Sequence, residues 1–259
     1  MKPNALILFA PGTNRDGDVA QALALAGAES QTLPLKTLRE TKTNWSKYQM
    51  LVVPGGFSYA DALGAGKLLA LDLSHYFLDQ VQAFVSAGKP VIGICNGFQA
   101  LVKSGILPGN NALTETRTAT LTYNHENHFE CRWVSLKPVS QTCLWTKGLS
   151  EIIDCPVAHG EGNFTLSSLE NAKLLTKNDQ IALVYTHPDG QTANGVYPIN
   201  PNGSVMDIAG ICNPQGNVLG LMPHPEDHIL SFQSPDRVHR PNASGLPLFI
   251  NGVRYASEQ

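Results

Sequence analysis

The sequence predicts an α/β fold in which a central, mostly parallel sheet is flanked by helices. Short apolar runs alternate with helix-like segments over the first part of the chain, and two of these runs lead into glycine-containing turns. Because the runs are apolar along nearly their whole length, the strands are expected to be buried on both faces, as in parallel sheets. At 259 residues, the chain can bury a substantial core without disulfides or metals.

The expected elements of this parallel part follow one another in order along the chain. Strands are expected at 6–10, 50–54 and 90–94, and helices at 18–26, within 62–88 and at 96–103.

After residue 107 the pattern changes to alternating polar and apolar residues, interrupted by turn signals. The expected strand pairs are 119–123 with 129–133 and 197–199 with 205–209, followed by a strand at 218–222. The first pair flanks a polar turn, which predicts a hairpin. These features predict an additional mixed or antiparallel sheet folded onto the parallel one.

The whole chain is interpreted as one domain, residues 1–259. No linker, repeat or low-complexity segment separates its two halves. The core is expected at about 5–230, followed by a polar tail with a short helix, 231–259.

The composition argues against several classes of function. A net charge of −3 provides no basic face for nucleic acid. No apolar stretch approaches the ~20 residues that span a bilayer, and the first apolar run is too short for a signal peptide. The five cysteines are scattered and include no C-x-x-C pair, which argues against a disulfide framework or structural zinc. We therefore expect a cytoplasmic protein that binds neither nucleic acid nor a membrane.

Cys95 lies in the segment Gly93-Ile94-Cys95-Asn96-Gly97, between an expected strand and an expected helix. This is the cysteine form of the G-x-S-x-G nucleophile elbow, in which small neighbours allow a sharp turn that exposes the nucleophile. A helix N-terminus also favours the thiolate. The alternative is a buried structural cysteine, which is the more common role of this residue type.

His224 is the candidate base for this nucleophile. It follows an expected strand between two prolines, and Glu226 would point to the same side in extended backbone. A carboxylate placed there can orient the imidazole and stabilise its charged form. Taken alone, the segment favours a surface turn over a catalytic one; its pairing with the cysteine elbow reverses this preference.

Backbone N–H groups at Gly55, Gly56 and Phe57, together with that of Asn96, are candidates for stabilising an oxyanion. The glycine pair can also be an ordinary turn. Segment 61–68 fails as a phosphate-binding loop, because Asp61 replaces its first glycine. The histidines at 125, 128 and 159 do not form a convincing ligand set, so no metal site is expected.

Four segments together resemble the class I (triad) glutamine amidotransferase family, and within it the glutaminase subunits of phosphoribosylformylglycinamidine synthase. These segments are GGFSY at 55–59, GICNGFQ at 93–99, PVAHGEG at 156–162 and GLMPHPE at 220–226. The similarity extends over roughly residues 6–226 and implies the fold of that family.

The resemblance implies a role for each matching residue. Cys95 would be the nucleophile, His224 the base and Glu226 the carboxylate that orients it. Glutamine and its oxyanion would be bound by Gly55, Gly56, Phe57, Asn96, Gln99, His159 and Gly160. Two residues depart from the family pattern: Ala60 replaces a glycine, and Arg15 stands where a small residue is expected. Neither is expected to touch the triad.

The resemblance also implies the partners. L-glutamine would be the substrate, and ammonia would pass to a separate synthetase subunit, with a small accessory subunit as a further partner. No cofactor is expected in this chain, whereas ATP and Mg are expected in the synthetase.

Two other interpretations remain open at this point. One is another enzyme built on the same elbow, either a hydrolase or an amidotransferase that serves a different synthetase. The other is a non-catalytic subunit that has kept the fold, although the presence of all three triad residues argues against it.

Overall fold

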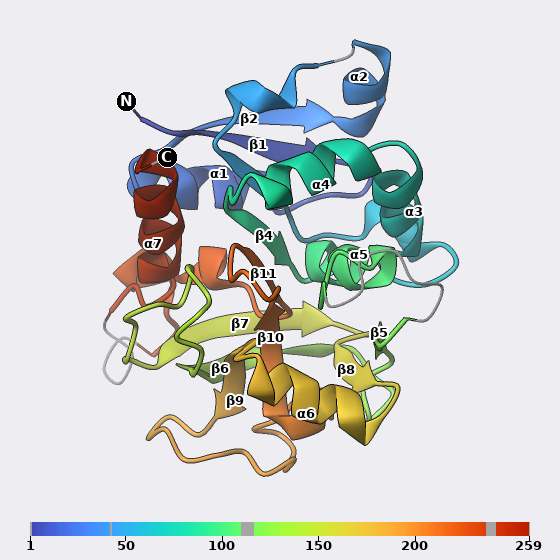
Figure 1. Cartoon of the computed structure of the whole chain (residues 1–259). Coiled ribbons are helices and arrows are strands. Elements are labelled where there is room, and N and C mark those ends of the chain that lie inside the picture. Colours follow the sequence, from blue (N-terminus) through green and yellow to red (C-terminus); the bar gives the residue numbers. More distant parts are fainter. Residues whose placement is uncertain (1, 42, 110–116, 237–241, 259) are drawn as a thin grey trace.

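The computed structural model describes residues 2–41, 43–109, 117–236 and 242–258 (Figure 1). Nine strands in this part of the chain form one sheet in the order β2-β1-β3-β4-β11-β10-β9-β6-β7, and β5 and β8 form a separate pair. Neighbours from β2 to β11 are parallel, and those from β11 to β7 are antiparallel.

The strands of the parallel half are β1 (Asn4–Phe9), β2 (Glu29–Pro34), β3 (Met50–Val53), β4 (Val91–Ile94) and β11 (Val218–Leu221). Those of the antiparallel half are β6 (Glu130–Pro138), β7 (Ile153–His159), β9 (Ile181–Thr186) and β10 (Ile208–Cys212). The separate pair is β5 (Ala119–Thr122) and β8 (Asn163–Leu166).

Helices cover both faces of the parallel half. The helices are α1 (Asp16–Leu25), α2 (Leu35–Glu40), α3 (Lys67–His75), α4 (Leu78–Ser86), α5 (Asn96–Ser104), α6 (Leu169–Lys177) and α7 (Leu246–Ser257). Helix α1 packs against α7, while α3 contacts both α4 and α5 (Figure 1). Every residue of β3, β4 and β11 is therefore buried, which explains why these strands read as continuous apolar runs.

The expected strands and helices of the parallel half are confirmed, with boundaries shifted by a few residues. Segment 62–88 contains two helices, α3 and α4. The edge strand β2 was not anticipated because five of its six residues are exposed and polar or proline. The short helix expected near 246–256 is α7, whereas residues 237–241 of the tail lie outside the described residues.

Most of the antiparallel half extends the main sheet, and the additional antiparallel sheet is the two-stranded pair of β5 and β8. The hairpin expected between 119–123 and 129–133 is wrong: β5 pairs with β8, and β6 pairs with β7 and β9. The intervening turn is held elsewhere, because the Asn124 backbone N–H donates to the Gly160 carbonyl at 2.9 Å and its side-chain amide donates to the His159 carbonyl at 2.8 Å.

The strand expected at 197–199 is also absent, and residues 205–207 form a three-ten turn before β10 begins at Ile208. The Asn200 side chain accounts for this difference. Its amide donates to the Ser204 carbonyl and to Asp207, while its oxygen accepts from the backbone N–H groups of Gly203 and Ser204. A side chain that satisfies the local backbone in this way removes the need for a paired strand.

Candidate active site

Cys95 forms the sharp turn between β4 and α5, with φ 50° and ψ −106°. This is a rare conformation for a residue with a side chain, and such strain is concentrated at functional sites. The neighbouring glycines are required by close packing. A Cβ on Gly97 would lie 1.8 Å from the Val53 carbonyl oxygen, and one on Gly93 would lie 2.5 Å from Leu101 Cδ1. Glycine at both positions therefore allows the close packing that the elbow needs.

His224 follows β11, which pairs in parallel with β4 in a register that places Leu221 opposite Ile94. The residues that come directly after these two strands therefore meet at one edge of the sheet, so His224 lies beside Cys95. The side chains are 3% exposed for His224 and 0% for Glu226, and His224 Nδ1 lies 2.7 Å from Glu226 Oε1.

The electrostatic environment of His224 favours its protonated form. Burial alone would lower the pKa of this imidazole, but the Glu226 carboxylate and the Cys95 sulfur outweigh burial and raise it well above its ordinary value. Nε2 is buried and has no hydrogen-bond partner among the described residues. The ring can therefore exchange a proton through Nε2 while Nδ1 stays bound to Glu226.

A cavity of about 170 Å³ opens above Cys95, whose side chain is only 4% exposed. Its wall comprises Gly56, Phe57, Asp61, Ala65, Cys95, Gln99, Tyr123, Phe129, Ala158, His159, Gly160 and Glu161. Five of the seven residues expected to bind glutamine or its oxyanion therefore line one cavity with the expected nucleophile: Gly56, Phe57, Gln99, His159 and Gly160.

Gly55 and Asn96, the other two expected binding residues, support the cavity from behind. Gly55 packs under the base, because a Cβ at this position would lie 2.8 Å from His224 Cε1. The Asn96 N–H belongs to the first turn of α5 and has no intrahelical acceptor. The Phe57 N–H is already engaged, since it donates to the Gly12 carbonyl at 2.9 Å.

The side chains of Asn96 and Gln99 tie three segments together beneath the cavity. Asn96 accepts from the Ser58 N–H at 3.2 Å and donates to Asp61 at 3.0 Å and to Gln99 at 3.1 Å. Gln99 in turn donates to the Glu161 carbonyl at 2.7 Å. This network fixes the loop after β3 and the loop after β7 to the helix that carries the nucleophile.

Two carboxylates, Asp61 and Glu161, share the cavity wall; among the described residues only Glu161 lies within ion-pair distance of a cation, although the charge of Lys103 also acts on Asp61. Glu161 accepts from the Ala65 N–H at 3.1 Å and lies 3.4 Å from Lys103 Nζ. Burial and then the negative charge of Glu161 raise the pKa of Asp61, although bonds from Gly66 and Asn96 oppose the shift. An unbalanced negative charge in a cavity wall is suited to a cationic group of a ligand.

Sequence reasoning did not assign Asp61, Tyr123 or Phe129 to the site. Asp61 is turned into the cavity by a run of left-handed residues that starts at Tyr59 and Ala60, with φ of 55°, 54° and 50° in order. No glycine marks this run, so its geometry has no sequence signal; the only indication was its place directly after the GGFSY segment. Tyr123 and Phe129 were misplaced with the hairpin.

His159 is a neutral residue of the cavity wall. Burial, followed by the charge of His224, lowers the pKa of His159 to about 3. Its Nδ1 lies 3.1 Å from the Asn124 side-chain oxygen, which also accepts from the Gly162 N–H. The Asn124 amide nitrogen donates to two carbonyls, so the orientation of Asn124 is fixed and the proton of His159 is on Nδ1.

The model of the CobB/CobQ-like glutamine amidotransferase domain matches residues 2–256. The chain belongs to this glutamine amidotransferase family. A curated relative, the phosphoribosylformylglycinamidine synthase subunit PurQ of Treponema denticola, is 57% identical over 89% of this chain and 90% of its own. The PurQ subunit of Dehalococcoides mccartyi is 39% identical over 99% of both chains.

Solved structures agree with this assignment. A chain of PurLQS from Thermotoga maritima superposes on this amidotransferase with a TM-score of 0.75, at 28% identity over 98% of this chain and 99% of its own. A glutamine amidotransferase from the same organism gives a TM-score of 0.58 at 14% identity, covers 100% of both chains, and shows the same fold. The predicted α/β amidotransferase fold is thus confirmed.

The amidotransferase has no group of three or more His, Cys, Asp or Glu side chains suited to a metal ion within the described residues. His125 packs against Gly203, and His128 contacts Tyr197 and Glu130. Of the helices that the structure describes, none is long and apolar enough to cross a membrane.

Arg15 lies closer to the triad than the sequence indicated. Its N–H approaches the Gly55 carbonyl at 3.3 Å, and its Cγ lies 3.4 Å from the position that a Cβ on Gly55 would occupy. These contacts are with neighbours of the expected triad and not with Cys95, His224 or Glu226 themselves. Asp227, which follows Glu226, is its partner at 3.4 Å.

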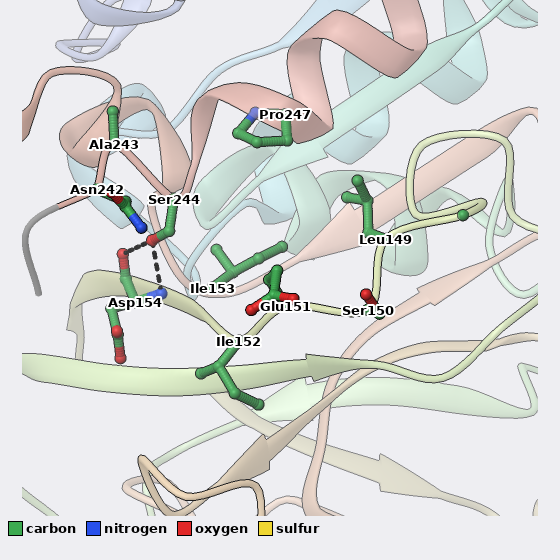
Figure 2. A pocket seen from close by; sticks show the side chains of 11 residues that line it. Leu149, Ser150, Glu151, Ile152, Ile153, Asp154, Asn242, Ala243, Ser244 and Pro247 are labelled. Carbon is green, nitrogen blue, oxygen red and sulfur yellow. Dashed lines mark hydrogen bonds between the residues drawn. The ribbon is translucent and has the colours of Figure 1, made fainter.

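A second cavity, of about 330 Å³, lies between residues 148–154 and the segment that leads into α7 (Figure 2). Ser244 bridges its two sides, donating to the Asp154 carbonyl at 3.0 Å and accepting from the Asp154 N–H at 2.9 Å. The bonds of Ser244 anchor the C-terminal segment of the amidotransferase. None of the residues that line this cavity belongs to the expected triad, so the cavity is not the candidate reaction site.

Proposed function

We propose that this chain is the glutaminase subunit of phosphoribosylformylglycinamidine synthase in purine biosynthesis. It hydrolyses glutamine and delivers ammonia to a synthetase subunit, which converts formylglycinamide ribonucleotide to formylglycinamidine ribonucleotide. The observation that carries the reaction is the strained elbow at Cys95, which lines the cavity and lies beside the buried His224–Glu226 pair. The pathway is supported by the PurQ relatives.

Catalysis begins with transfer of the Cys95 thiol proton to His224 Nε2. The thiolate attacks the side-chain amide carbon of glutamine and forms a tetrahedral oxyanion. His224 returns the proton to the departing nitrogen, the C–N bond breaks, and ammonia leaves a γ-glutamyl thioester on Cys95. Water, deprotonated by the same imidazole, then hydrolyses the thioester, which releases glutamate and restores the thiol.

Glu226 holds the histidine in the tautomer and orientation that this sequence needs. The short bond to Nδ1 leaves Nε2 as the only nitrogen that can face the sulfur. The raised pKa of His224 favours transfer of the thiol proton to its imidazole. The backbone N–H groups of Gly56 and Asn96 are the oxyanion donors, and each such donor typically contributes ~10²–10³ in rate.

The cavity recognises glutamine through its α-ammonium group. Asp61 carries the unbalanced negative charge, and a carboxylate has acceptor capacity beyond its bonds to Asn96 and Gly66. Gln99, His159 and Gly160 complete the wall that surrounds the rest of the substrate.

In the proposed complex, this chain releases ammonia and the synthetase consumes it. The chain acts as one domain, since the family match spans residues 2–256. It uses no cofactor of its own, and ATP and Mg belong to the synthetase, with a small accessory subunit as a further partner. A cytoplasmic location is supported by the five cysteines, all of which are free thiols.

The test is replacement of the nucleophile. Cys95→Ala should abolish glutamate release and labelling by a diazoketone analogue of glutamine, while thermal unfolding and binding to the synthetase stay as in the wild type. Cys131→Ala is the matched control, because this thiol is exposed and does not line the cavity. Retention of a tenth of wild-type turnover by Cys95→Ala would remove the assignment.

A further inference from the structure

Arg15 and Asp227 face each other across the junction between the loop before α1 and the triad turn, residues 224–228. Arg15 Nη1 lies 3.4 Å from Asp227 Oδ1 and 3.2 Å from Asp18 Oδ2. The guanidinium is 37% exposed and Asp227 is 18% exposed, so the acid lies deeper than its partner. The pair joins two segments that are far apart in sequence.

Arg15 and the base both lie close to Gly55. The position of a Cβ on Gly55 would be 3.4 Å from Arg15 Cγ and 2.8 Å from His224 Cε1. The stem of Arg15 and the ring of His224 therefore approach the same side of one glycine, where its Cβ would lie. A shift of the triad turn relative to Arg15 would change the distance from His224 to the segment after β3 that carries Gly55 and Gly56.

We propose that Arg15 and Asp227 are positioning residues for the glutaminase reaction, holding the triad turn against Gly55 so that His224 and Glu226 stay aligned on Cys95. This inference rests on the proposed function. Neither side chain touches the substrate cavity; both act through the turn that carries the base.

The charges at the junction indicate that the pair is kept for function more than for stability. Burial and the adjacent Glu226 carboxylate raise the pKa of Asp227 to about 6, and His224 and Arg15 only partly offset them. Asp18 acts from α1. Of the other elements packed on the turn, β7 contributes His159, which is neutral, and α7 meets the turn through the backbone of Gly245.

A raised carboxyl pKa fixes the sign of the stability effect. The folded protein holds the Asp227 proton more tightly than the unfolded chain does. The stability contribution of this group is therefore fully present below its unfolded pKa and is lost as the pH rises through about 6. Ionised Asp227 destabilises the fold, whereas a salt bridge selected for stability would have lowered its pKa.

The experiment uses the chain in complex with its synthetase and measures kcat, KM and thermal unfolding from pH 5 to 9. At pH 8, Asp227→Asn should lower kcat about 10-fold with little change in KM, because a misplacement of ~1 Å can reduce the rate by up to ~10². The same substitution should raise the unfolding temperature. It should also remove the fall in kcat near pH 6 that protonation of Asp227 causes in the wild type.

Arg15 provides the second arm. Arg15→Met keeps the aliphatic stem but loses the charge that lowers the pKa of Asp227, so the acid limb of kcat should move to higher pH. Arg15→Lys keeps a positive charge and should move the acid limb part of the way back toward the wild-type position. Asp18→Asn is the opposite arm: the Asp18 carboxylate raises the pKa of Asp227, so its removal should move the acid limb slightly to lower pH.

Three results would overturn the proposal: a wild-type kcat and pH profile in Arg15→Met, a fall in both kcat and unfolding temperature in Asp227→Asn, or an effect confined to KM. Each is distinguishable from failure of the glutaminase assignment, which would appear as turnover in Cys95→Ala.

Discussion

Replacing Asp61 with asparagine tests how the cavity recognises glutamine. Asp61 lines the same cavity as Cys95, and its neighbour Glu161 already has partners in Lys103 and the Ala65 N–H. An α-ammonium group would therefore find its unbalanced counter-charge at Asp61. The asparagine keeps the shape of the side chain and one acceptor oxygen, so the substitution removes the charge and little else.

The size of the effect follows from the environment of the carboxylate. A hydrogen bond to a charged group contributes roughly 1.5–3 kcal/mol, which corresponds to about 10- to 150-fold in an equilibrium constant. Asp61 is half-buried, so solvent screening places the effect in the lower part of that range. We expect KM for glutamine to rise about 10- to 30-fold, with kcat changed much less.

The assay compares glutamine with glutaramate, which lacks only the α-amino group, and follows ammonia release from both. In Asp61→Asn the loss of kcat/KM should be confined to glutamine. Asp72→Asn is the matched control: Asp72 supports the same loop by accepting from the Tyr59 hydroxyl but does not line the cavity. An equal loss for both substrates in Asp61→Asn would refute recognition of the ammonium and leave only a structural role.

Three further predictions concern the triad, the elbow and the coupling to the synthetase. His224→Ala should reduce glutamate release nearly as much as Cys95→Ala, whereas Glu226→Gln should be milder because it keeps the shape that orients the ring; equal losses would show that Glu226 takes part in proton transfer directly. Gly97→Ala should destabilise the protein by about 1–3 kcal/mol or more in denaturant unfolding, because its Cβ would lie 1.8 Å from the Val53 oxygen. Gly17→Ala, where a Cβ meets nothing within 4 Å, should be neutral or stabilising. Glutamate release by the isolated chain should be weak and should rise steeply when the synthetase, ATP and acceptor nucleotide are added; equal turnover in both states would exclude gating.

The parallel half of the fold could be predicted because its physical cause is local. Strands such as β3 and β4 are buried on both faces, and burial on both faces leaves an uninterrupted apolar run. The placement of the expected triad residues side by side could be predicted for a related reason. Cys95 and His224 each follow such a strand, and the carboxyl ends of parallel strands meet at one edge of the sheet.

The antiparallel half could not be predicted in detail, because single side chains decide its connections. The alternation of β5 and β6 is real, yet Asn124 directs the turn between them toward the loop after β7. Alternation alone indicates which residues of a strand face the core, and it carries no information about which strand is the partner. The pairing of Arg15 with Asp227, more than two hundred positions apart in the chain, was hidden for the same reason.

The oxyanion loop shows how a motif can be recognised while its state is not. Gly56 and Phe57 of the GGFSY segment line the cavity, but the Phe57 N–H donates to the Gly12 carbonyl, and Thr13 and Gly56 form an isolated antiparallel bridge beside it. A Cβ on Gly12 would lie 2.1 Å from the Phe57 oxygen, and one on Gly56 would lie 2.7 Å from the Gly12 oxygen. The two glycines therefore allow the loops to approach closely enough to occupy one potential donor. Because a peptide beside glycine can reorient with little steric hindrance, release of this contact when the synthetase docks would give the cavity a further oxyanion donor, which is the physical basis for expecting a slow isolated subunit.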